Sequence, residues 1–309
     1  MHQTQIPSWA WLVFGVTVLV LLAVDLWSYH GEQRQGKQLH RKNLYWTIAW
    51  VCVGLGFGGF VWMVGDGHMA QEYYAAYAME KGLSLDNLFL FYVIFKGLRI
   101  AEEYQHRVLF WGILGAVVFR GVFIFLGVEA IERWNWVSYL FAAVLLYGAW
   151  RSARKNPGEE EGSRTVEWLS NHLPVTKRVE DHNFLAEKDG RWAASPLLLA
   201  LLAIEITDVM FAVDSVPAAL SVTHNRFLVY SSNIFAILGL RALYLYLQTS
   251  FDKFRYLHYG LAAVLAFAGI KILLDGVIEI SPALSIGVIV ACIGASVWAS
   301  LRAQHEERT

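Results

Sequence analysis

The chain has 309 residues, of which 56% are hydrophobic and only 17% are charged, whereas soluble domains usually carry about 25% charged residues. Its formal net charge is -1, and no basic stripe with interleaved aromatic residues is present, so nucleic acid is not an expected partner. The two cysteines, Cys52 and Cys292, lie in separate apolar runs, which argues against a disulfide framework or a thiolate zinc site. The composition is typical of a polytopic membrane protein.

Segments that could cross a bilayer recur along the whole chain. A helix needs about 20 mainly apolar residues to cross a hydrocarbon core of about 30 Å. We therefore predict an all-α polytopic membrane protein, forming a single transmembrane domain over residues 1–309, with about nine transmembrane helices. The predicted spans are Trp9–Tyr29, Leu44–Val64, Glu72–Phe95, Val108–Gly127, Trp134–Trp150, Ser195–Leu220, Phe227–Gln248, Phe254–Leu274 and Pro282–Leu301.

The basic residues outside these spans are unevenly distributed. If the N-terminus is outside, the outer loops hold only Arg133 and Arg226, and the inner loops hold all the others. Cytoplasmic loops are enriched in Lys and Arg, so the pattern predicts an N-out/C-in topology. The one long loop, residues 151–194, is then cytoplasmic. We expect a solvated connector with a short amphipathic helix around Thr165–Leu173, or alternatively a regulatory metal contact at residues 180–182.

Two acidic segments interrupt spans that are otherwise apolar. Glu80 and Asp86 lie in the first segment, and Asp208 and Asp214 lie 128 residues further along in the second. Ionisable residues within a membrane are energetically costly and usually functional. We expect the chain to bring the two segments together.

The spans that follow each acidic segment also correspond. Arg120 and Arg241 occupy equivalent positions 121 residues apart, and an Ala-Ala-Val-Leu sequence recurs in the third span of each set. Three spans therefore repeat as a unit, in residues 72–150 and residues 195–274. Because the number of spans in the unit is odd, the second copy enters the membrane from the opposite side. Spans three to five and six to eight are thus predicted to form an inverted repeat with a site near the midplane.

The spacing within each acidic segment indicates an irregular helix. Residues six apart on a continuous helix point about 120° away from each other, so Glu80 and Asp86 would not share a face. Gly82 lies between them, and Pro217 follows Asp214, where proline removes one helical hydrogen bond. Broken helices at membrane depth are tolerated where they line a polar cavity. We therefore predict a helix break near Gly82 in the first segment and near Pro217 in the second.

The polar side chains of the two segments form a set of oxygen ligands. Such ligands suit Mg²⁺, Ca²⁺ or Mn²⁺ better than zinc or copper. Five carboxylates in hydrocarbon could not all stay ionised without compensation by a metal ion, by protons or by intramembrane arginines. Exchange of metal for protons would amount to antiport. The candidate transport or metal residues are Glu80, Asp86, Asn87, Glu205, Asp208, Asp214 and Ser215.

Structural ion pairs are the alternative interpretation of these charges. We expect Arg120 and Arg241 to be counter-charges to the acids rather than substrate contacts. Asp25, at the inner end of the first span, is expected to be solvated or to cap a loop. Met79 and Met210 adjoin the acids and are either packing residues or soft ligands that favour manganese.

Three segments carry motifs of a known family. They read Glu-Lys-x-x-x-x-Asp-Asn at 80–87, Glu-x-x-Asp-x-x-Phe-Ala-Val-Asp-Ser-x-Pro-Ala at 205–218, and Ser-Asn-Ile-Phe-Ala-Ile-Leu-Gly-Leu-Arg-Ala-Leu-Tyr at 232–244. The chain resembles the TerC family of integral membrane proteins, in particular its Alx-type members. That family is associated with manganese efflux, tellurite resistance and the alkaline-pH response, and it belongs with transporters of inverted three-helix repeats. The resemblance implies that the five carboxylates are the transport residues, with Asn87 and Ser215 as neutral partners.

We therefore expect a bacterial inner-membrane exporter of a divalent cation, with Mn²⁺ as the first candidate, working by alternating access in exchange for protons. Ca²⁺ and Mg²⁺ use overlapping ligand sets and stay open as substrates. No enzymatic activity, catalytic residue or cofactor is expected. The expected partners are the lipid bilayer, the cation and protons, and the oligomeric state is left open. The alternatives are a membrane component of a tellurite or alkaline-pH stress-response complex without transport, and an intramembrane diaspartyl hydrolase, in which two carboxylates share a proton and activate water.

Overall fold

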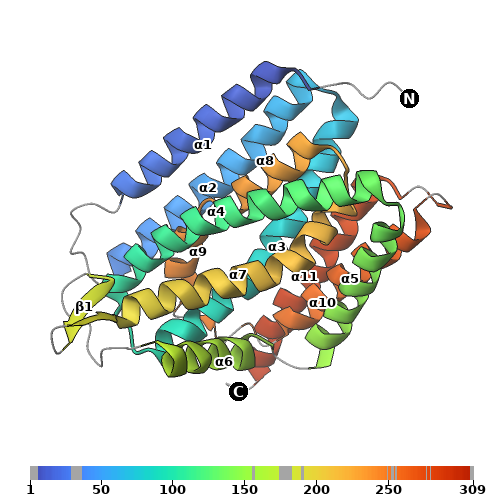
Figure 1. Ribbon diagram of the computed structural model, residues 1–309. Helices are drawn as coiled ribbons and strands as arrows, with labels where there is room; N and C mark the ends of the chain where they lie inside the picture. The colour runs from blue at the N-terminus through green and yellow to red at the C-terminus, as the bar shows by residue number, and fades with distance from the viewer. Residues whose placement is uncertain are drawn as a thin grey trace.

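A computed structural model describes residues 6–28, 37–154, 157–173, 183–188, 191–248, 250–251, 254, 256–275, 277–278 and 280–306. These residues form helices that lie side by side, together with one short antiparallel β-hairpin (Figure 1). The elements are α1 (Ser8–Ser28), α2 (Lys37–Val64), α3 (Gly67–Gly97), α4 (Glu102–Arg133), α5 (Trp136–Arg154), α6 (Pro157–His172), β1 (Leu185–Lys188), β2 (Arg191–Ala194), α7 (Pro196–Leu220), α8 (Arg226–Ile237), α9 (Leu240–Leu247), α10 (Leu257–Leu274) and α11 (Pro282–Glu306).

Seven helical segments among the described residues are long and apolar enough to cross a membrane. They lie in α1, α2, α4, α7, α10 and α11, and in the segment Arg226–Leu247, which comprises α8 and α9. The predicted all-α polytopic membrane fold is therefore confirmed in its class. Nine spans were expected. The two expected spans that are not among these seven correspond to α3 and α5.

The composition of α3 reflects its central position. It packs against α2, α7, α8 and α11 and lies behind α7 in Figure 1. Tyr73, Met79 and Leu88 are fully buried along its length, as is Glu80. A helix enclosed by other helices can carry polar residues that a lipid-facing helix cannot, and these lower its hydropathy.

The helices α3 and α7 run antiparallel. Phe91 and Ile94, near the end of α3, share a hydrophobic cluster with Leu197 near the start of α7. At the opposite end of the bundle, Met79 of α3 shares a different cluster with Ala218, near the end of α7. The two acidic segments therefore pass each other in opposite directions.

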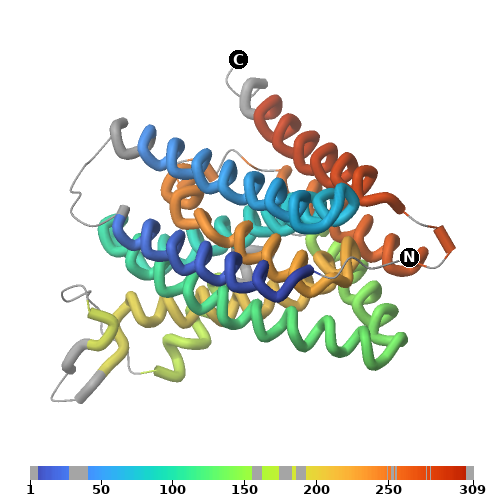
Figure 2. The backbone as a smooth tube through the Cα atoms, turned by 90° about the horizontal axis from the view of Figure 1, so that it is seen from above, coloured from blue at the N-terminus to red at the C-terminus, as the bar shows by residue number. Residues whose placement is uncertain are grey.

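Three helix pairs dominate the contacts between the two halves of the chain. The most extensive pairings among the described helices are α5 with α10, α3 with α8, and α4 with α7. If α3 is exchanged for α7, α4 for α8 and α5 for α10, the pairing of α3 with α8 becomes the pairing of α7 with α4. The pairing of α5 with α10 is unchanged by the same exchange. In the view of Figure 2, α11 and the β-hairpin lie at opposite margins of this arrangement.

The predicted helix breaks near Gly82 and Pro217 are wrong, because α3 and α7 are both continuous through their acidic segments. Gly82 serves close packing instead: a β-carbon there would collide with Ile293 of α11. Pro217 lies in the last turn of α7, and the helix continues through it to Leu220 although proline cannot donate a hydrogen bond to the carbonyl of Val213.

A break occurs instead in the segment predicted as the unbroken span Phe227–Gln248. The helix α8 ends at Ile237 and α9 begins at Leu240, with Gly239 between them at φ 84°. This left-handed conformation is accessible to glycine at little cost. A β-carbon on Gly239 would also collide with the side chain of Trp50 on α2.

Residues 151–194 contain more structure than the predicted connector. The helix around Thr165–Leu173 is present as the longer α6, and β1 and β2 precede α7. The helix α6 packs against α3 and α7, with Gly162 next to Val93 and Ile94 and with Leu169 buried. The predicted metal contact at residues 180–182 lies outside the described residues.

Candidate functional site

Arg120 joins the two acidic segments through buried ion pairs. Its Nη1 lies 2.6 Å from Glu80 Oε2 on α3, and its Nη2 lies 3.0 Å from Asp208 Oδ1 on α7. The Nε of Arg120 also donates to Asp208 Oδ2 at 3.3 Å, which makes the second pair bidentate. All three side chains are buried. Since Glu80 and Asp208 occupy equivalent positions in the two acidic segments, one arginine of α4 binds both members of a related pair.

Asn87 extends this cluster. Its Nδ2 lies 3.5 Å from Asp208 Oδ1, and its side chain is buried. The expected counter-charge for the acids is thus supplied at Glu80 and Asp208 by Arg120. We refer to Glu80, Arg120, Asp208 and Asn87 as the Arg120 cluster.

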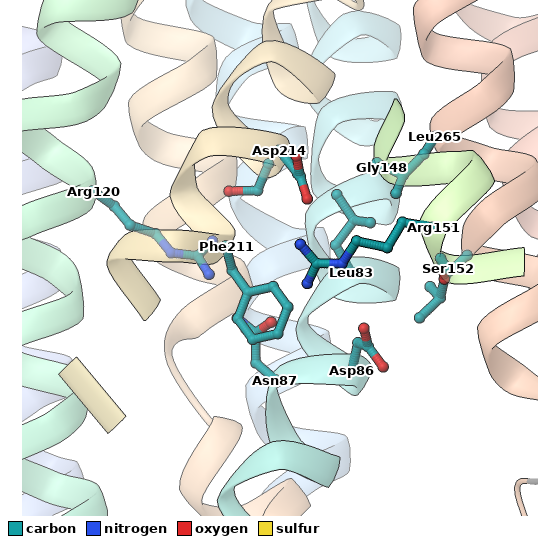
Figure 3. A pocket seen from close by; sticks show the side chains of 12 residues that line it. Leu83, Asp86, Asn87, Arg120, Gly148, Arg151, Ser152, Phe211, Asp214 and Leu265 are labelled. Carbon is teal, nitrogen blue, oxygen red and sulfur yellow. The ribbon is translucent and has the colours of Figure 1, made fainter. Parts of the chain in front are cut away.

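The other related pair of acids, Asp86 and Asp214, lines a small cavity of about 40 Å³ next to the Arg120 cluster. A cavity of this size has room for a few water molecules or one ion. Its polar lining includes Asn87 and Ser215, and Arg120 borders it (Figure 3). The repeat-related residues Asp86 and Asp214, and Asn87 and Ser215, therefore meet at one place.

The backbone of α5 forms one wall of this cavity. A β-carbon at Gly148 would lie 3.3 Å from both carboxylate oxygens of Asp214, so the carboxylate rests against bare backbone. One turn further along α5, Arg151 and Ser152 also line the cavity. Arg151 thus places a positive charge in the lining that also contains the carboxylates of Asp86 and Asp214. In Figure 3, Arg120 and Arg151 enter from opposite sides.

Glu205 does not line the cavity. Its carboxylate packs against Gly115 of α4, where a β-carbon would collide with it. Glu205 and Asp208, three residues apart, both face α4, as expected for one helix face. The buried Oε2 of Glu205 has no hydrogen-bond partner within the described part of the chain.

Arg241 does not compensate any of the five predicted acids. Its Nη2 lies 3.0 Å from Asp25 Oδ2 and also donates to the backbone carbonyl of Asp25. Both side chains are buried. The expectation that Arg241 compensates the transport acids is therefore wrong, and Asp25 is buried, which rules out the solvated role expected as one of its two alternatives. The pair instead joins the C-terminal part of α1 to the start of α9.

The five carboxylates are not gathered in one site in this conformation. They divide into the Arg120 cluster, the cavity pair and Glu205. No group of three or more His, Cys, Asp or Glu side chains with the geometry to hold a metal ion occurs among the described residues. Met79 is buried in a hydrophobic cluster and so is a packing residue here, whereas Met210 is 45% exposed; neither lines the cavity.

Sequence reasoning overlooked two residues that line the cavity. Arg151 appeared to be an ordinary cytoplasmic basic residue after a span, and Gly148 gave no signal. One signal was available in the sequence. The fifth span is followed by two arginines three residues apart, so if the helix extends to the second arginine, the first lies about one turn before the helix end.

The fold and the site together define a polytopic helical membrane protein whose core carries buried acids balanced by arginines. The sequence model described as the integral membrane protein TerC family matches residues 66–308, and the chain belongs to this family.

Proteins of known sequence extend the match over nearly the whole chain. A relative from Myxococcus xanthus named "Uncharacterized membrane protein STKORF319" is 40% identical over 94% of this chain and 91% of its own length. A relative from Escherichia coli K12 named "Putative membrane-bound redox modulator Alx" is 37% identical over 90% of both chains. An uncharacterized membrane protein from Rickettsia bellii is 32% identical over 94% of this chain and 97% of its own length. No solved structure matches.

Proposed function

We propose that the protein exports a divalent metal ion, with Mn²⁺ as the first candidate, across the bacterial inner membrane in exchange for protons. The observation that carries this proposal is the convergence of Asp86 and Asp214 on one cavity that Asn87 and Ser215 also line. Two carboxylates and two neutral oxygens supply ligands of the type that Mn²⁺, Mg²⁺ and Ca²⁺ prefer. As an ion carrier, the protein would be a transporter and not an enzyme.

The packing supports an inverted repeat of α3–α5 and α7–α10. The antiparallel course of α3 and α7, and the exchange of helix contacts described above, are those of two units related by an axis in the membrane plane. Counting α3 and α5 as spans gives nine passes, which puts the two ends of the chain on opposite sides of the membrane, and the distribution of basic residues favours the N-out/C-in orientation. Alternating access then consists of rocking one unit against the other around the acids.

The two groups of acids suggest different tasks. In the Arg120 cluster, a bidentate arginine neutralises buried carboxylates and fixes α3, α4 and α7 relative to one another. Removing either charge would leave a buried ion uncompensated, so this cluster is suited to hold the framework. Asp86 and Asp214 are only partly buried and are the acids with room for an ion. We assign them the transported cation.

A second cavity supports access from the opposite face. It has a volume of about 430 Å³ and lies at the other end of α5, where His68, Glu72, His224, Lys271 and Asp275 line it. Glu72 Oε2 accepts a hydrogen bond from Thr223 Oγ1 at 2.7 Å, which joins the start of α3 to the turn after α7. In an N-out/C-in protein this cavity faces the outside and is suited to ion release.

The test is uptake of Mn²⁺ into inverted membrane vesicles. Wild-type protein should take up Mn²⁺ when a proton gradient is imposed, and Asp86→Asn and Asp214→Asn should abolish uptake without loss of the folded protein. Glu132→Gln removes an exposed carboxylate at the end of α4, where it pairs with Arg226 outside both cavities, and should retain most of the activity. If both cavity variants transport as well as wild type, the site assignment is wrong. Competition with Ca²⁺ and Mg²⁺ in the same vesicles ranks the substrates.

The printed name of the Escherichia coli relative favours one alternative. A membrane-bound redox modulator could act as a component of a stress-response complex without moving ions. In that case, the cellular phenotype would survive loss of Asp86 and Asp214. The pairing of these two acids also keeps the diaspartyl hydrolase as a minor alternative, which metal-independent peptide cleavage by the purified protein would support.

A further inference from the structure

Arg151 occupies a place where a transported cation would be expected. It lies in the last turn of α5, is half-buried, and lines the same cavity as Asp86 and Asp214. Figure 3 shows its guanidinium reaching from α5 toward the space between the two carboxylates. The side chain therefore places a positive charge at the acids that have room for an ion.

The charges around the cavity show what Arg151 contributes to it. Arg120 also borders the cavity, but its guanidinium is already held by Glu80 and Asp208. The guanidinium of Arg151 lines the cavity together with the carboxylates of Asp86 and Asp214. Two carboxylates next to each other in a poorly hydrated space repel each other unless a cation lies between them. In the conformation seen here, Arg151 is that cation.

A divalent cation and the guanidinium cannot share this space. Two like charges in such a space repel each other, and the repulsion doubles when one of them is a doubly charged ion. The cavity of about 40 Å³ is the space left with Arg151 in place, so withdrawal of the guanidinium would also enlarge the room around the ion. Binding of the ion therefore requires the guanidinium to leave.

Arg151 lies close enough to the end of α5 for its guanidinium to reach water outside the cavity. Long arginine side chains near the end of a membrane helix can extend to the interface and keep their charge in water. The helix α5 ends only three residues later, at Arg154. A change in the side-chain torsions of Arg151, without movement of α5, would carry the guanidinium out of the cavity.

We propose that Arg151 is a built-in competitor for the transported cation: it neutralises Asp86 and Asp214 when the site is empty, and it withdraws toward the inner face when a divalent ion binds. This inference rests on the proposed function. Arg151 then sets the affinity for the ion by competing with it. After the ion is released, the guanidinium returns to Asp86 and Asp214, so that the two carboxylates stay compensated while the site holds no ion. It is a positioning residue and not an ion ligand.

The neighbouring arginine provides a matched control. Arg154 lies on the same turn of α5, but its side chain is exposed and its guanidinium lies 4.4 Å from the centre of the Trp150 ring. It does not line the cavity. Substituting Arg154 changes the net charge as substituting Arg151 does, without changing the charge next to the acids.

The experiment measures Mn²⁺ binding to the purified full chain in nanodiscs by calorimetry, with Ca²⁺ and Mg²⁺ titrated in parallel. Arg151→Gln should bind Mn²⁺ at least about tenfold more tightly than wild type, because the competing charge is gone. Arg151→Lys should keep most of the wild-type affinity, and Arg154→Gln should bind like wild type. In vesicles, Arg151→Gln should export more slowly than wild type because the ion is released less readily.

The outcomes distinguish this inference from the proposed function. A purely structural role for Arg151 predicts a lower melting temperature and unchanged or weaker binding, and that result in a folded Arg151→Gln protein would overturn the inference alone. Equal tightening by Arg154→Gln would also overturn it, because the effect would then be one of net charge. Absence of binding of all three metal ions by both wild type and Arg151→Gln would overturn the proposed function and the inference together.

Discussion

The guanidinium of Arg120 lies 2.6 Å from the carboxylate of Glu80, and neither side chain is more than 1% exposed. Asp208 binds the same guanidinium from α7, so α3, α4 and α7 meet at one charge. Among the described residues, this cluster shows most directly how the two acidic segments are held together. The contribution of the Arg120 cluster to the stability of the folded protein can be measured separately from transport.

Arg120→Met is expected to destabilise the protein strongly. The substitution leaves Glu80 and Asp208 buried without compensation, which costs about 3–5 kcal/mol for a broken buried pair. The melting temperature in detergent measures the effect. Arg133→Met, on the same helix, is the control, because Arg133 is 65% exposed and its pair with Glu129 contributes at most about 1 kcal/mol.

A double substitution checks the cause of that loss. Adding Glu80→Gln to Arg120→Met removes one of the uncompensated charges and should recover part of the melting temperature. Equal destabilisation by Arg120→Met and Arg133→Met, or no recovery in the double variant, would show that the cluster does not fix the framework.

Gly148→Ala is expected to impair export without unfolding the protein. The new methyl group would lie 3.3 Å from both carboxylate oxygens of Asp214 and would push that carboxylate into the cavity. Displacing a positioned group by about 1 Å can cost up to about a hundredfold in rate, so we expect a loss of about tenfold in Mn²⁺ uptake. Gly287→Ala on α11, where a β-carbon meets nothing within 4 Å, should transport normally. Normal uptake by Gly148→Ala would argue against Asp214 as an ion ligand.

The sequence predicted the membrane class, the family and the correspondence of the two acidic segments, because these depend on residue type and spacing. Ion pairing depends on how distant helices meet and could not be predicted in this way. Arg120 and Arg241 occupy equivalent positions in the chain, yet Arg120 binds an acid 88 residues away on α7, and Arg241 binds one 216 residues away on α1. The helix α1 lies outside the repeat, so nothing in the repeat indicates that it supplies a partner.

The predicted helix breaks were wrong for a related reason. Glycine in a membrane helix can allow a break or a close helix contact, and sequence alone does not distinguish the two. Gly82 is next to Ile293 of α11, a residue more than two hundred positions away, and this contact accounts for it. At Gly239, by contrast, the chain does leave the helical conformation.

Gly239→Ala is expected to destabilise the protein by more than about 2 kcal/mol. A non-glycine residue in the left-handed region costs about 1–2 kcal/mol, and the new β-carbon would also displace Trp50, which is 4% exposed. Thermal unfolding of the purified protein measures the change. Gly294→Ala, in a helical position with open space around it, should have little effect or be slightly stabilising. If the two variants melt at the same temperature, the break does not require glycine.

Lys81→Met is expected to lower stability while leaving the affinity for Mn²⁺ unchanged. Lys81 follows Glu80 in the sequence, but its Nζ donates to the carbonyl oxygen of Ala236 at 3.0 Å, where α8 ends. Carbonyls at the end of a helix lack partners within it, and a cation satisfies them and interacts favourably with the helix dipole. A hydrogen bond from a charged donor contributes about 1.5–3 kcal/mol, so the melting temperature should fall. Lys81→Arg should retain much of the stability.

The affinity measurement separates this role from ion binding. Lys81 does not line the cavity with Asp86 and Asp214, so its charge is not expected to compete with the transported ion as that of Arg151 is. Lys96→Met, at the exposed end of the same helix, is the control for the loss of one lysine. If Lys81→Met tightened Mn²⁺ binding to the extent expected of Arg151→Gln, then Lys81 would belong to the charge balance of the ion site, and the break between α8 and α9 would need another source of stability.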